Sequence, residues 1–484
     1  MPDDLGSASS PEQSQLRREL NVWHATAIVV GTIIGSGIFL VPAEMMQAAG
    51  SASLVYLAWI VGAGLSLFGA LTYAELGSRR PYTGGSYVYV RDAYGPLAGF
   101  LCAWSTFLIT QPASIATIAV GLIRILGSFE RLHCLSTAIF VIRGTGNRVL
   151  MVTNGQLLAI STVILITALN YFGVRRSGDF QLLFTSLKVM VIVGIAVIVL
   201  FATSGSINNF ASHVEHARGG VGGFMAALVA TLWAYEGWQG VTQVAGEIRQ
   251  PSKAIPIALL AGTALAALLY MGINASIQYA LPASSIAHSS LPVATATQVV
   301  LGRSGAVLVS AVMAVSLLTT LNGAIIGGPR IAFAAAHNGY FLRSLGKANP
   351  RFHTPSLALL IQAAVSALLV LVGGAFHDLF SLFISIAWLW YMIAASSVFV
   401  LRRRDLIFGG AYRMWGYPIV PGLFIASSAV LLFYTFADNV RGSAIAVLGI
   451  LVGIPVFYLS RSRRKNTGNA APRQTSDTFA KQMG

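Results

Sequence analysis

The stretch from Gly31 to Gly37 has the residue types of a backbone binding site for a charged small molecule. It reads GTIIGSG and lies inside an apolar run from Val22 to about Ala48, which is long enough to cross a bilayer. Glycine loosens a helix at this depth, and an unpaired peptide group in hydrocarbon costs about 2–7 kcal/mol. Such a break is tolerated where protein or a water-filled cavity satisfies the backbone. Free N–H groups at the start of a half-helix would then suit a carboxylate.

The same spacing has a second interpretation. Gly31 and Gly35 form a GxxxG pattern, which is typical of two membrane helices that pack closely together. The spacing alone leaves the two interpretations open. The rest of the chain favours the binding site, because a similar interruption recurs further along.

That second interruption lies between Thr231 and Gly240 and reads TLWAYEGWQG. It places Glu236 at about the middle of an apolar run. The carboxylate of Glu236 could read the side chain of a substrate, exchange a proton, or point into water on an access path. An ionisable group at this depth is a functional hypothesis by default.

Lys188 is the only basic residue that falls deep within an apolar run. It lies eight residues beyond Phe180, or about 12 Å at 1.5 Å per residue, which is far for a lysine to reach the membrane surface. We therefore favour a function for Lys188. The alternative is a neutral or surface-seeking lysine with no role.

Composition identifies the class of protein that must position these residues. The chain has 484 residues, of which 55% are hydrophobic and 10% charged, and the charges cluster in short loops between long apolar runs. This is an integral membrane protein. An enzyme in the membrane would need converging catalytic groups or metal ligands at depth. Apart from Lys188 and Glu236 the span centres offer almost none, so we expect no enzyme activity, metal or cofactor.

We expect about twelve membrane spans. They cover roughly residues 22–47, 52–76, 97–126, 153–173, 180–202, 220–244, 254–280, 305–335, 356–374, 378–401, 416–437 and 443–460. With both termini in the cytoplasm, 23 of the 31 Lys and Arg residues lie on the cytoplasmic side and 7 outside. This is the positive-inside bias, so the net charge of +15 reports topology and not a nucleic-acid partner.

The two interruptions fall in the first and sixth spans, and so at corresponding places of two five-span halves. Matching interrupted spans are typical of inverted-repeat transporters and mark their binding site. The predicted fold is therefore all-α, with 5+5 inverted repeats at about 21–202 and 219–401 and discontinuous first and sixth helices. Two extra helices follow at about 415–461 and complete a single domain, 21–461. Residues 1–20 and 462–484 are polar tails without a secretory signal pattern.

Three further expectations concern a proline, three glutamates and the two cysteines. Gln111–Pro112 interrupts the third span and predicts a kink. Glu44, Glu75 and Glu247 lie near span ends, where interface or gate ion pairs are expected. The two cysteines, Cys102 in the third span and Cys134 in the long outside loop 127–151, cannot form a disulfide framework or a zinc site and are expected to be free thiols.

Five motifs give the chain a specific resemblance. They are GTIIGSGIF (31–39), PYTGGSYVYVRDAYGPLAGF (81–100), LWAYEGW (232–238) with GEIRQPSKAIP (246–256), TTLNG (319–323), and LRRR (401–404) with YRMWGYPIVP (412–421). Over residues 20 to 460 the chain resembles an amino-acid permease of the amino acid–polyamine–organocation superfamily, closest to the L-type amino-acid transporter branch and of bacterial type. The resemblance implies the LeuT fold.

The resemblance also implies how a substrate binds. In such permeases the amino-acid carboxylate meets backbone N–H groups of the first broken helix, here at Ser36 and Gly37 with Gly35. The ammonium meets carbonyls of both broken helices, here of Ile33, Trp233 and Glu236. The physics agrees, because helix-end dipoles neutralise the ligand without leaving a buried ion in the empty site.

Other residues take roles from the same resemblance. Trp233 matches an aromatic residue that closes over the substrate from outside, although a packing or lipid-facing tryptophan is the alternative. Lys188 matches a lysine that reaches the first broken helix and replaces a sodium ion. Weaker pocket candidates follow: Gln239, Asn322 and Trp388.

The expected function is sodium-independent exchange of neutral L-amino acids by alternating access in the bacterial inner membrane. Its alternative is a proton-coupled symporter or a carrier of cationic amino acids or polyamines, with Lys188 or Glu236 as the titrating group. A non-transporting receptor also stays open. Mammalian L-type chains join a glycoprotein partner through a cysteine in the loop where Cys134 lies. Since Cys134 has a different setting, we expect no obligatory partner besides the lipid bilayer.

Overall fold

The fold is that of a computed structural model, which describes residues 16–127, 134–143, 149–202, 205–372, 376–404 and 411–466. Among these residues, ten helical stretches are long and apolar enough to span a membrane. They are Val22–Ala49, Ala52–Arg79, Pro96–Gly127, Asn154–Tyr171, Val174–Phe201, Pro251–Ala280, Arg303–His337, Phe383–Arg404, Ile419–Ala437 and Val440–Leu459. Shorter apolar helices occupy Gly220–Ala234, Pro292–Leu301 and Ser356–Val372.

The first half of the chain is helical apart from one hairpin. Its elements are α1 (Val22–Ile33), α2 (Gly37–Ala49), α3 (Ala52–Arg79), α4 (Ser86–Tyr94), α5 (Pro96–Ser105), the π-helical turn η1 (Thr106–Thr110), α6 (Gln111–Gly127), β1 (Ala138–Arg143), β2 (Val149–Thr153), α7 (Asn154–Tyr171) and α8 (Val174–Ala202). Local sequence starts several of these helices. Asn21 and His24 form a capping box on α1, and Thr153 and Gln156 form one on α7.

The second half begins with the other interrupted helix. Its elements are η3 (Ile207–Ala211), α9 (Gly220–Ala234), α10 (Gly240–Gln243), η4 (Ala245–Glu247), α11 (Pro251–Ala280), α12 (Ala283–His288), α13 (Pro292–Leu301), α14 (Arg303–His337), η5 (Arg343–Gly346), α15 (Ser356–Val372), α16 (Phe376–Arg404), α17 (Ile419–Asp438) and α18 (Val440–Asn466). Both expected interruptions are confirmed, at 34–36 between α1 and α2 and at 235–239 between α9 and α10.

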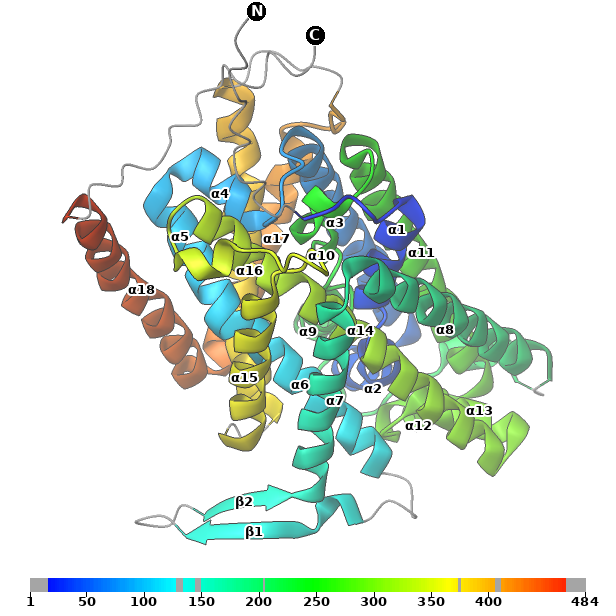
Figure 1. The fold of residues 1–484 in the computed structure, drawn as a ribbon. Helices are drawn as coiled ribbons and strands as arrows, with labels where there is room; N and C mark the ends of the chain where they lie inside the picture. Colours follow the sequence, from blue (N-terminus) through cyan, green and yellow to red (C-terminus); the bar gives the residue numbers. More distant parts are fainter. Residues whose placement is uncertain are drawn as a thin grey trace, which may run out of the picture.

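Figure 1 shows the long helices running between two ends of the molecule, with α4 near one end and the β1–β2 hairpin at the other. We call these the α4 end and the hairpin end. The hairpin was not predicted, although the β-branched residues of both strands, with Phe140 in β1, favour β-structure. Helices α12 and α13 also fill a stretch that the sequence analysis left without elements.

The irregularity expected near Gln111–Pro112 takes the form of a π turn. The helix continues from α5 through η1 into α6, and the N–H of Gln111 donates to the carbonyl of Thr106. Proline lacks an N–H and disturbs the preceding turn, and a π turn is one way in which a helix absorbs this disturbance. It widens the helix where α5 and α6 face the centre of the molecule.

Both interpretations of the first motif, close helix packing and a binding site, correspond to glycines in the structure, Gly31 and Gly37. A Cβ on Gly31 would lie 2.0 Å from Nε2 of Gln181 and 2.6 Å from Oγ1 of Thr185, both on α8. Gly31 is therefore a close-packing position between α1 and α8. A Cβ on Gly37 would lie 3.1 Å from Cα of Ala234, so Gly37 lets the start of α2 approach the end of α9, and with it the second interruption.

Candidate functional site

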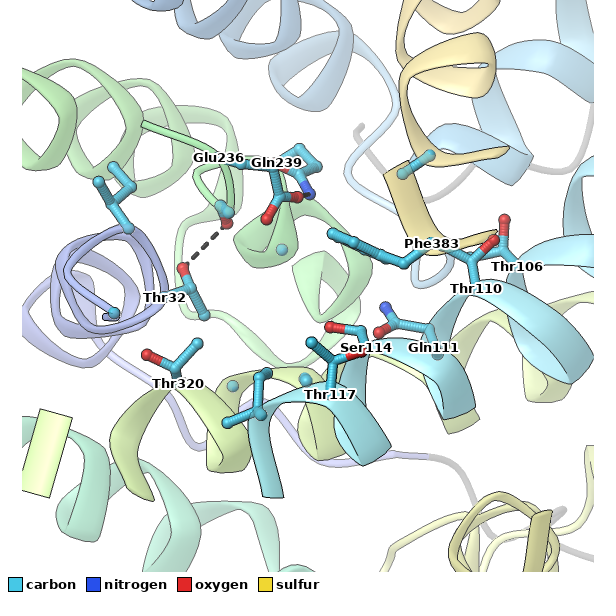
Figure 2. Close-up of a pocket in the computed structure, with 18 of the residues that line it drawn as sticks. Thr32, Thr106, Thr110, Gln111, Ser114, Thr117, Glu236, Gln239, Thr320 and Phe383 are labelled. Carbon is cyan, nitrogen blue, oxygen red and sulfur yellow. Dashed lines mark hydrogen bonds between the residues drawn. The ribbon is translucent and has the colours of Figure 1, made fainter. Parts of the chain in front are cut away.

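The two interruptions face one central cavity of about 140 Å³. Roughly 10–15 Å³ by this measure holds one water molecule, so the cavity has room for a small amino acid. Its walls come from α1, α2, α4, α9, α10, α14, α16 and the α5–η1–α6 helix. Figure 2 shows Thr32, Glu236 and Gln239 on one side of this space and Ser114 and Thr117 of α6 across from them.

The start of α2 offers backbone donors to this cavity. Gly35, Ser36 and Gly37 line it, and the N–H groups of Ser36, Gly37 and Ile38 have no acceptor among the described residues. The N–H of Gly35 donates to the carbonyl of Ile33 at 2.8 Å and is therefore occupied. The first N–H groups of a helix carry its positive dipole end, so this corner of the cavity favours an anionic group.

The second interruption supplies acceptors at the same cavity. Glu236 and Thr32 both line it, and the carbonyl oxygens of Glu236 and Thr32 accept no hydrogen bond from any described residue. The carbonyl of Trp233 accepts from the N–H of Glu236 at 3.0 Å, and that of Ile33 accepts from Gly35 and from the hydroxyl of Tyr270. Of the three carbonyls expected to face an ammonium, that of Glu236 is thus the open one, and Thr32 adds another.

Two side chains tie the interruptions together. The hydroxyl of Thr32 donates to the carbonyl of Gly237 at 2.9 Å. Gly237 has a φ of 118°, and a Cβ there would lie 2.9 Å from the carbonyl carbon of Thr32, so the site requires glycine. Tyr270 of α11 lies within 2.9 Å of the Ile33 carbonyl and 3.0 Å of the Ala234 carbonyl. Tyr270 was not predicted, since no feature of the surrounding sequence indicates this contact.

Lys188 reaches the first interruption from α8. Its ammonium is buried and donates to the carbonyls of Gly31 at 2.9 Å and Ile34 at 2.7 Å, and to the hydroxyl of Thr319 at 2.6 Å. All three of its donors are therefore used. The carbonyls belong to the end of α1, where the helix dipole is negative and suits a cation. The contact implied by the resemblance is present, whereas its role in place of sodium stays a prediction.

Glu236 lies inside a hydrogen-bonded cluster at the cavity wall. Its Oε1 accepts from the hydroxyl of Tyr391 at 2.8 Å and from Nε2 of Gln239 at 2.9 Å. Gln239 also contacts the Tyr391 hydroxyl, and its own Oε1 has no partner among the described residues. All three side chains line the cavity. Tyr391 was not predicted, because the sequence analysis selected a neighbouring aromatic residue of α16.

That neighbour, Trp388, was wrongly predicted to line the pocket. The cavity is lined by Phe383, Ala387, Trp390 and Tyr391, which share one face of α16. Trp388 follows Ala387 by one residue, or about 100° around the helix. It packs instead against Tyr391 and Phe424, with ring centroids 5.9 and 6.2 Å apart.

Asn322 was also wrongly predicted to line the pocket. Thr320 and Gly323 of α14 line the cavity, while Asn322 is fully buried on another face of the helix. Its Oδ1 accepts from Asn170 at 2.8 Å and Ser177 at 2.9 Å, and its Nδ2 donates to Gln181 at 2.8 Å. Asn322 therefore joins α14 to α7 and α8.

A row of polar side chains on the α5–η1–α6 helix forms the opposite wall. The residues follow one another at intervals of one, three or four: Thr106, Thr110, Gln111, Ser114 and Thr117. Thr117 is 7% exposed, and its hydroxyl has no hydrogen-bond partner among the described residues. The sequence analysis overlooked this row, although polar residues on one face of an apolar span are a readable signal.

A buried ion pair joins α14 to η4 near the cavity. Arg330 of α14 donates to Glu247 at 2.7 and 3.1 Å, and both side chains are fully buried. The N–H of Leu20 donates to the Glu247 carbonyl at 3.0 Å. Glu75 pairs with Arg402 at 2.5 Å in a second cluster. The ion pairs expected for Glu75 and Glu247 are confirmed, whereas Glu44 is exposed and forms no ion pair with the described residues.

Both cysteines are free thiols, as expected. Cys102 is buried and lines the cavity, and Cys134 is exposed. Within the described residues, no group of three or more His, Cys, Asp or Glu side chains could hold a metal ion.

Comparison with known proteins agrees with this geometry. The family described as "Amino acid permease" matches residues 20–455. The serine/threonine exchanger SteT of Bacillus subtilis is 31% identical over 94% of this chain and 99% of its own. The Asc-type amino acid transporter 1 of Mus musculus is 28% identical over 93% of this chain and 82% of its own. The b(0,+)-type amino acid transporter 1 of Mus musculus is 28% identical, with coverages of 94% and 91%. These relatives are transporters and not enzymes. The chain belongs to the amino acid permease family.

Proposed function

We propose that this chain exchanges neutral L-amino acids across the bacterial inner membrane by alternating access and without sodium. One observation carries the proposal: unpaired N–H groups at the start of α2 and unpaired carbonyls at the two interruptions face the same cavity. This arrangement fits the two charged groups that all amino acids share. The names of the three relatives, all of them amino-acid carriers, support the same conclusion.

The proposal also includes the membrane topology, which adds two spans to the ten long ones. Adding α9 with α10, and α15, gives twelve spans, arranged as inverted repeats over 21–202 and 219–401 with both termini in the cytoplasm. Helices α17 and α18 follow the repeats, and 21–461 forms one transport domain. The matching positions of the two interruptions support the repeat, and the distribution of Lys and Arg supports the orientation.

In the bound state, the substrate carboxylate accepts hydrogen bonds from the N–H groups of Ser36 and Gly37 beside Gly35. The ammonium donates to the carbonyl of Glu236, with Ile33 and Trp233 nearby. The carbonyl of Thr32, which is also open, completes this acceptor set. Backbone groups alone recognise the two charged groups, so this part of the recognition needs no buried charged side chain.

The substrate side chain then faces the polar row of α6. An unpaired buried hydroxyl costs about 1–3 kcal/mol, so a substrate that bonds to Thr117 and Ser114 is favoured over an aliphatic substrate of the same size. We infer a preference for small amino acids with hydroxyl or amide side chains. The name of the Bacillus subtilis relative, a serine/threonine exchanger, agrees with this inference.

Counterflow in proteoliposomes tests the proposal. Purified protein should take up labelled serine or threonine only when the vesicles contain an amino acid, equally with sodium or potassium outside and without a pH gradient. Amino-acid amides and esters should compete poorly, because they lack the carboxylate. Strong stimulation by sodium, or uptake driven by a proton gradient into empty vesicles, would contradict the exchanger. Activity of the purified chain alone would also show that no second subunit is obligatory.

The first variant concerns Trp233, which lines the cavity at the end of α9. If its ring closes the occupied site, Trp233→Ala should slow exchange about tenfold while substrate affinity changes less, because water then reaches a site that must close before the carrier reorients. Initial rates and equilibrium binding separate the two effects. Trp415→Ala is the matched control, since Trp415 is 69% exposed. Equal exchange rates for both variants would make Trp233 a packing residue.

The second variant concerns Glu236, whose side chain we expect to affect selectivity. Glu236→Gln keeps the size, the backbone carbonyl and an oxygen that can accept from Tyr391 and Gln239. It should therefore still exchange small neutral amino acids, while competition by basic amino acids weakens about tenfold relative to neutral ones, because their buried charge loses its partner. Competition profiles with about twenty amino acids at one pH measure this change. Unchanged profiles would place the side chain outside the pocket, and loss of all transport would indicate proton coupling.

A further inference from the structure

The cavity is much longer than one amino acid. On the α5–η1–α6 helix its lining residues extend from Cys102 to Gly121, about 28 Å along the helix at 1.5 Å per residue, which is several times the length of a free amino acid. The proposed binding site occupies the part beside the interruptions. A second part extends toward the α4 end, and we call it the inner chamber: Ser86, Tyr87, Cys102 and Thr106.

Two amide side chains meet between these parts. Nε2 of Gln111, at the start of α6, donates to Oε1 of Gln243 at 3.3 Å. Both residues line the cavity, and Figure 2 shows Gln111 pointing into it. Gln243 ends α10, the short helix that directly follows the second interruption. The hydrogen bond therefore joins the interrupted helix to the opposite wall.

The backbone of α14 packs closely against this pair. A Cβ on Gly327 would lie 1.7 Å from Oε1 of Gln243. Any residue larger than glycine would therefore clash with Gln243 and displace it. A Cβ on Gly328 would lie 1.9 Å from Oε1 of Gln362 and 3.1 Å from Cβ of Gln111. The two consecutive glycines thus leave space for three amide side chains, one each from α6, α10 and α15.

Gln362 is the unexplained member of this group. It is 1% exposed, yet neither its Oε1 nor its Nε2 has a hydrogen-bond partner among the described residues. Leaving a buried amide unpaired is costly, and such groups in native structures call for an explanation. Gln362 and Gln111 lie against the same face of Gly328. Gln362 is therefore placed to receive the amide of Gln111 when that amide leaves Gln243.

We propose that Gln111 and Gln243 form a gate between the substrate site and the inner chamber, and that Gln362 is the alternative partner of Gln111 when the gate opens. In the closed state the pair blocks passage toward the α4 end. When α10 moves away during the cycle, Gln111 turns to Gln362 and the substrate enters the chamber. The gating role rests on the proposed alternating access, whereas the barrier itself can be measured without any substrate.

Cys102 reports on this barrier, because it lies in the inner chamber and Cys134 is the only other cysteine. In a Cys134→Ser background, a membrane-impermeant thiol reagent is added to the hairpin side of vesicles and labelling of Cys102 is followed over time. Gln111→Leu should speed labelling about tenfold, as expected for loss of one hydrogen bond. Gln362→Leu should leave labelling no faster than in the parent and should slow exchange. Thr162→Val, at a half-buried position of α7 that does not line the cavity, is the matched control.

Equal labelling rates in the parent and in Gln111→Leu, with an unchanged melting temperature, would overturn the gate. Faster labelling in Gln362→Leu would overturn the role of Gln362. Failure of the proposed exchange would look different: the parent protein would not exchange amino acids, and yet Gln111→Leu would still expose Cys102.

Discussion

Replacing Lys188 by alanine should lower the exchange rate at least about a hundredfold while the protein still inserts and remains monodisperse. The ammonium satisfies the carbonyls of Gly31 and Ile34 and the hydroxyl of Thr319. Without it, each carbonyl keeps one hydroxyl donor, Thr320 on Gly31 and Ser316 on Ile34. Both carbonyls nevertheless lose a hydrogen bond from a charged donor, worth about 1.5–3 kcal/mol, and 1.4 kcal/mol corresponds to a factor of ten. The end of α1 should then relax away from α8. Substrate counterflow at saturating substrate measures the loss.

Two control variants separate charge from stability. Lys188→Met keeps much of the side-chain length without the donors, so it should be as defective as alanine. Lys253→Ala removes an exposed lysine from the first turn of α11 and should leave exchange unchanged. If sodium restores exchange in Lys188→Ala, the lysine occupies a cation site. Exchange in Lys188→Ala within a factor of two of the wild type would make Lys188 dispensable.

The parts of this fold that sequence reasoning predicted are those that a bilayer dictates. Spans of about 20 apolar residues, the break at Gly35 and Ser36, and the break at Glu236 are visible because polar or flexible residues are expensive in hydrocarbon. The same rule singled out Lys188. In each case a polar or flexible residue at membrane depth is costly enough that its presence alone indicates a special local structure.

Contacts between distant spans left no such pattern. Trp388 and Asn322 were candidates for the pocket, but the rotation of α16 and α14 decides which face of the helix they lie on. That rotation is set by packing against other helices, and it brought Tyr391 and Thr320 to the cavity instead. Tyr270 was likewise invisible, since its two acceptors belong to segments that meet only in the folded protein. The hairpin β1–β2 was missed for another reason: its strands have five or six residues, and so short an apolar run is a much weaker signal than a membrane span.

Gly37→Val should reduce substrate binding at least about a hundredfold. A Cβ at this position would already lie 3.1 Å from Cα and 3.2 Å from Cβ of Ala234, closer than ordinary van der Waals contact. Two further methyl groups must therefore push the start of α2 away from the end of α9. Overpacking of this kind typically costs about 1–3 kcal/mol. The displacement also separates the N–H groups of Ser36 and Gly37 from the acceptor carbonyl of Glu236, so that one amino acid can no longer reach both sets.

The chain provides graded controls for this prediction. Gly37→Ala adds only the Cβ and should weaken binding by an intermediate amount, about tenfold. Gly64→Val lies in α3 where a Cβ meets nothing within 4 Å, so it should bind like the wild type and shows that valine in a span is tolerated. Equilibrium binding of labelled serine or threonine, with melting temperatures of all three variants, decides the matter. If Gly37→Val binds with wild-type affinity, the start of α2 does not hold the carboxylate. If its melting temperature falls while the affinity of the folded fraction is unchanged, Gly37 serves packing alone.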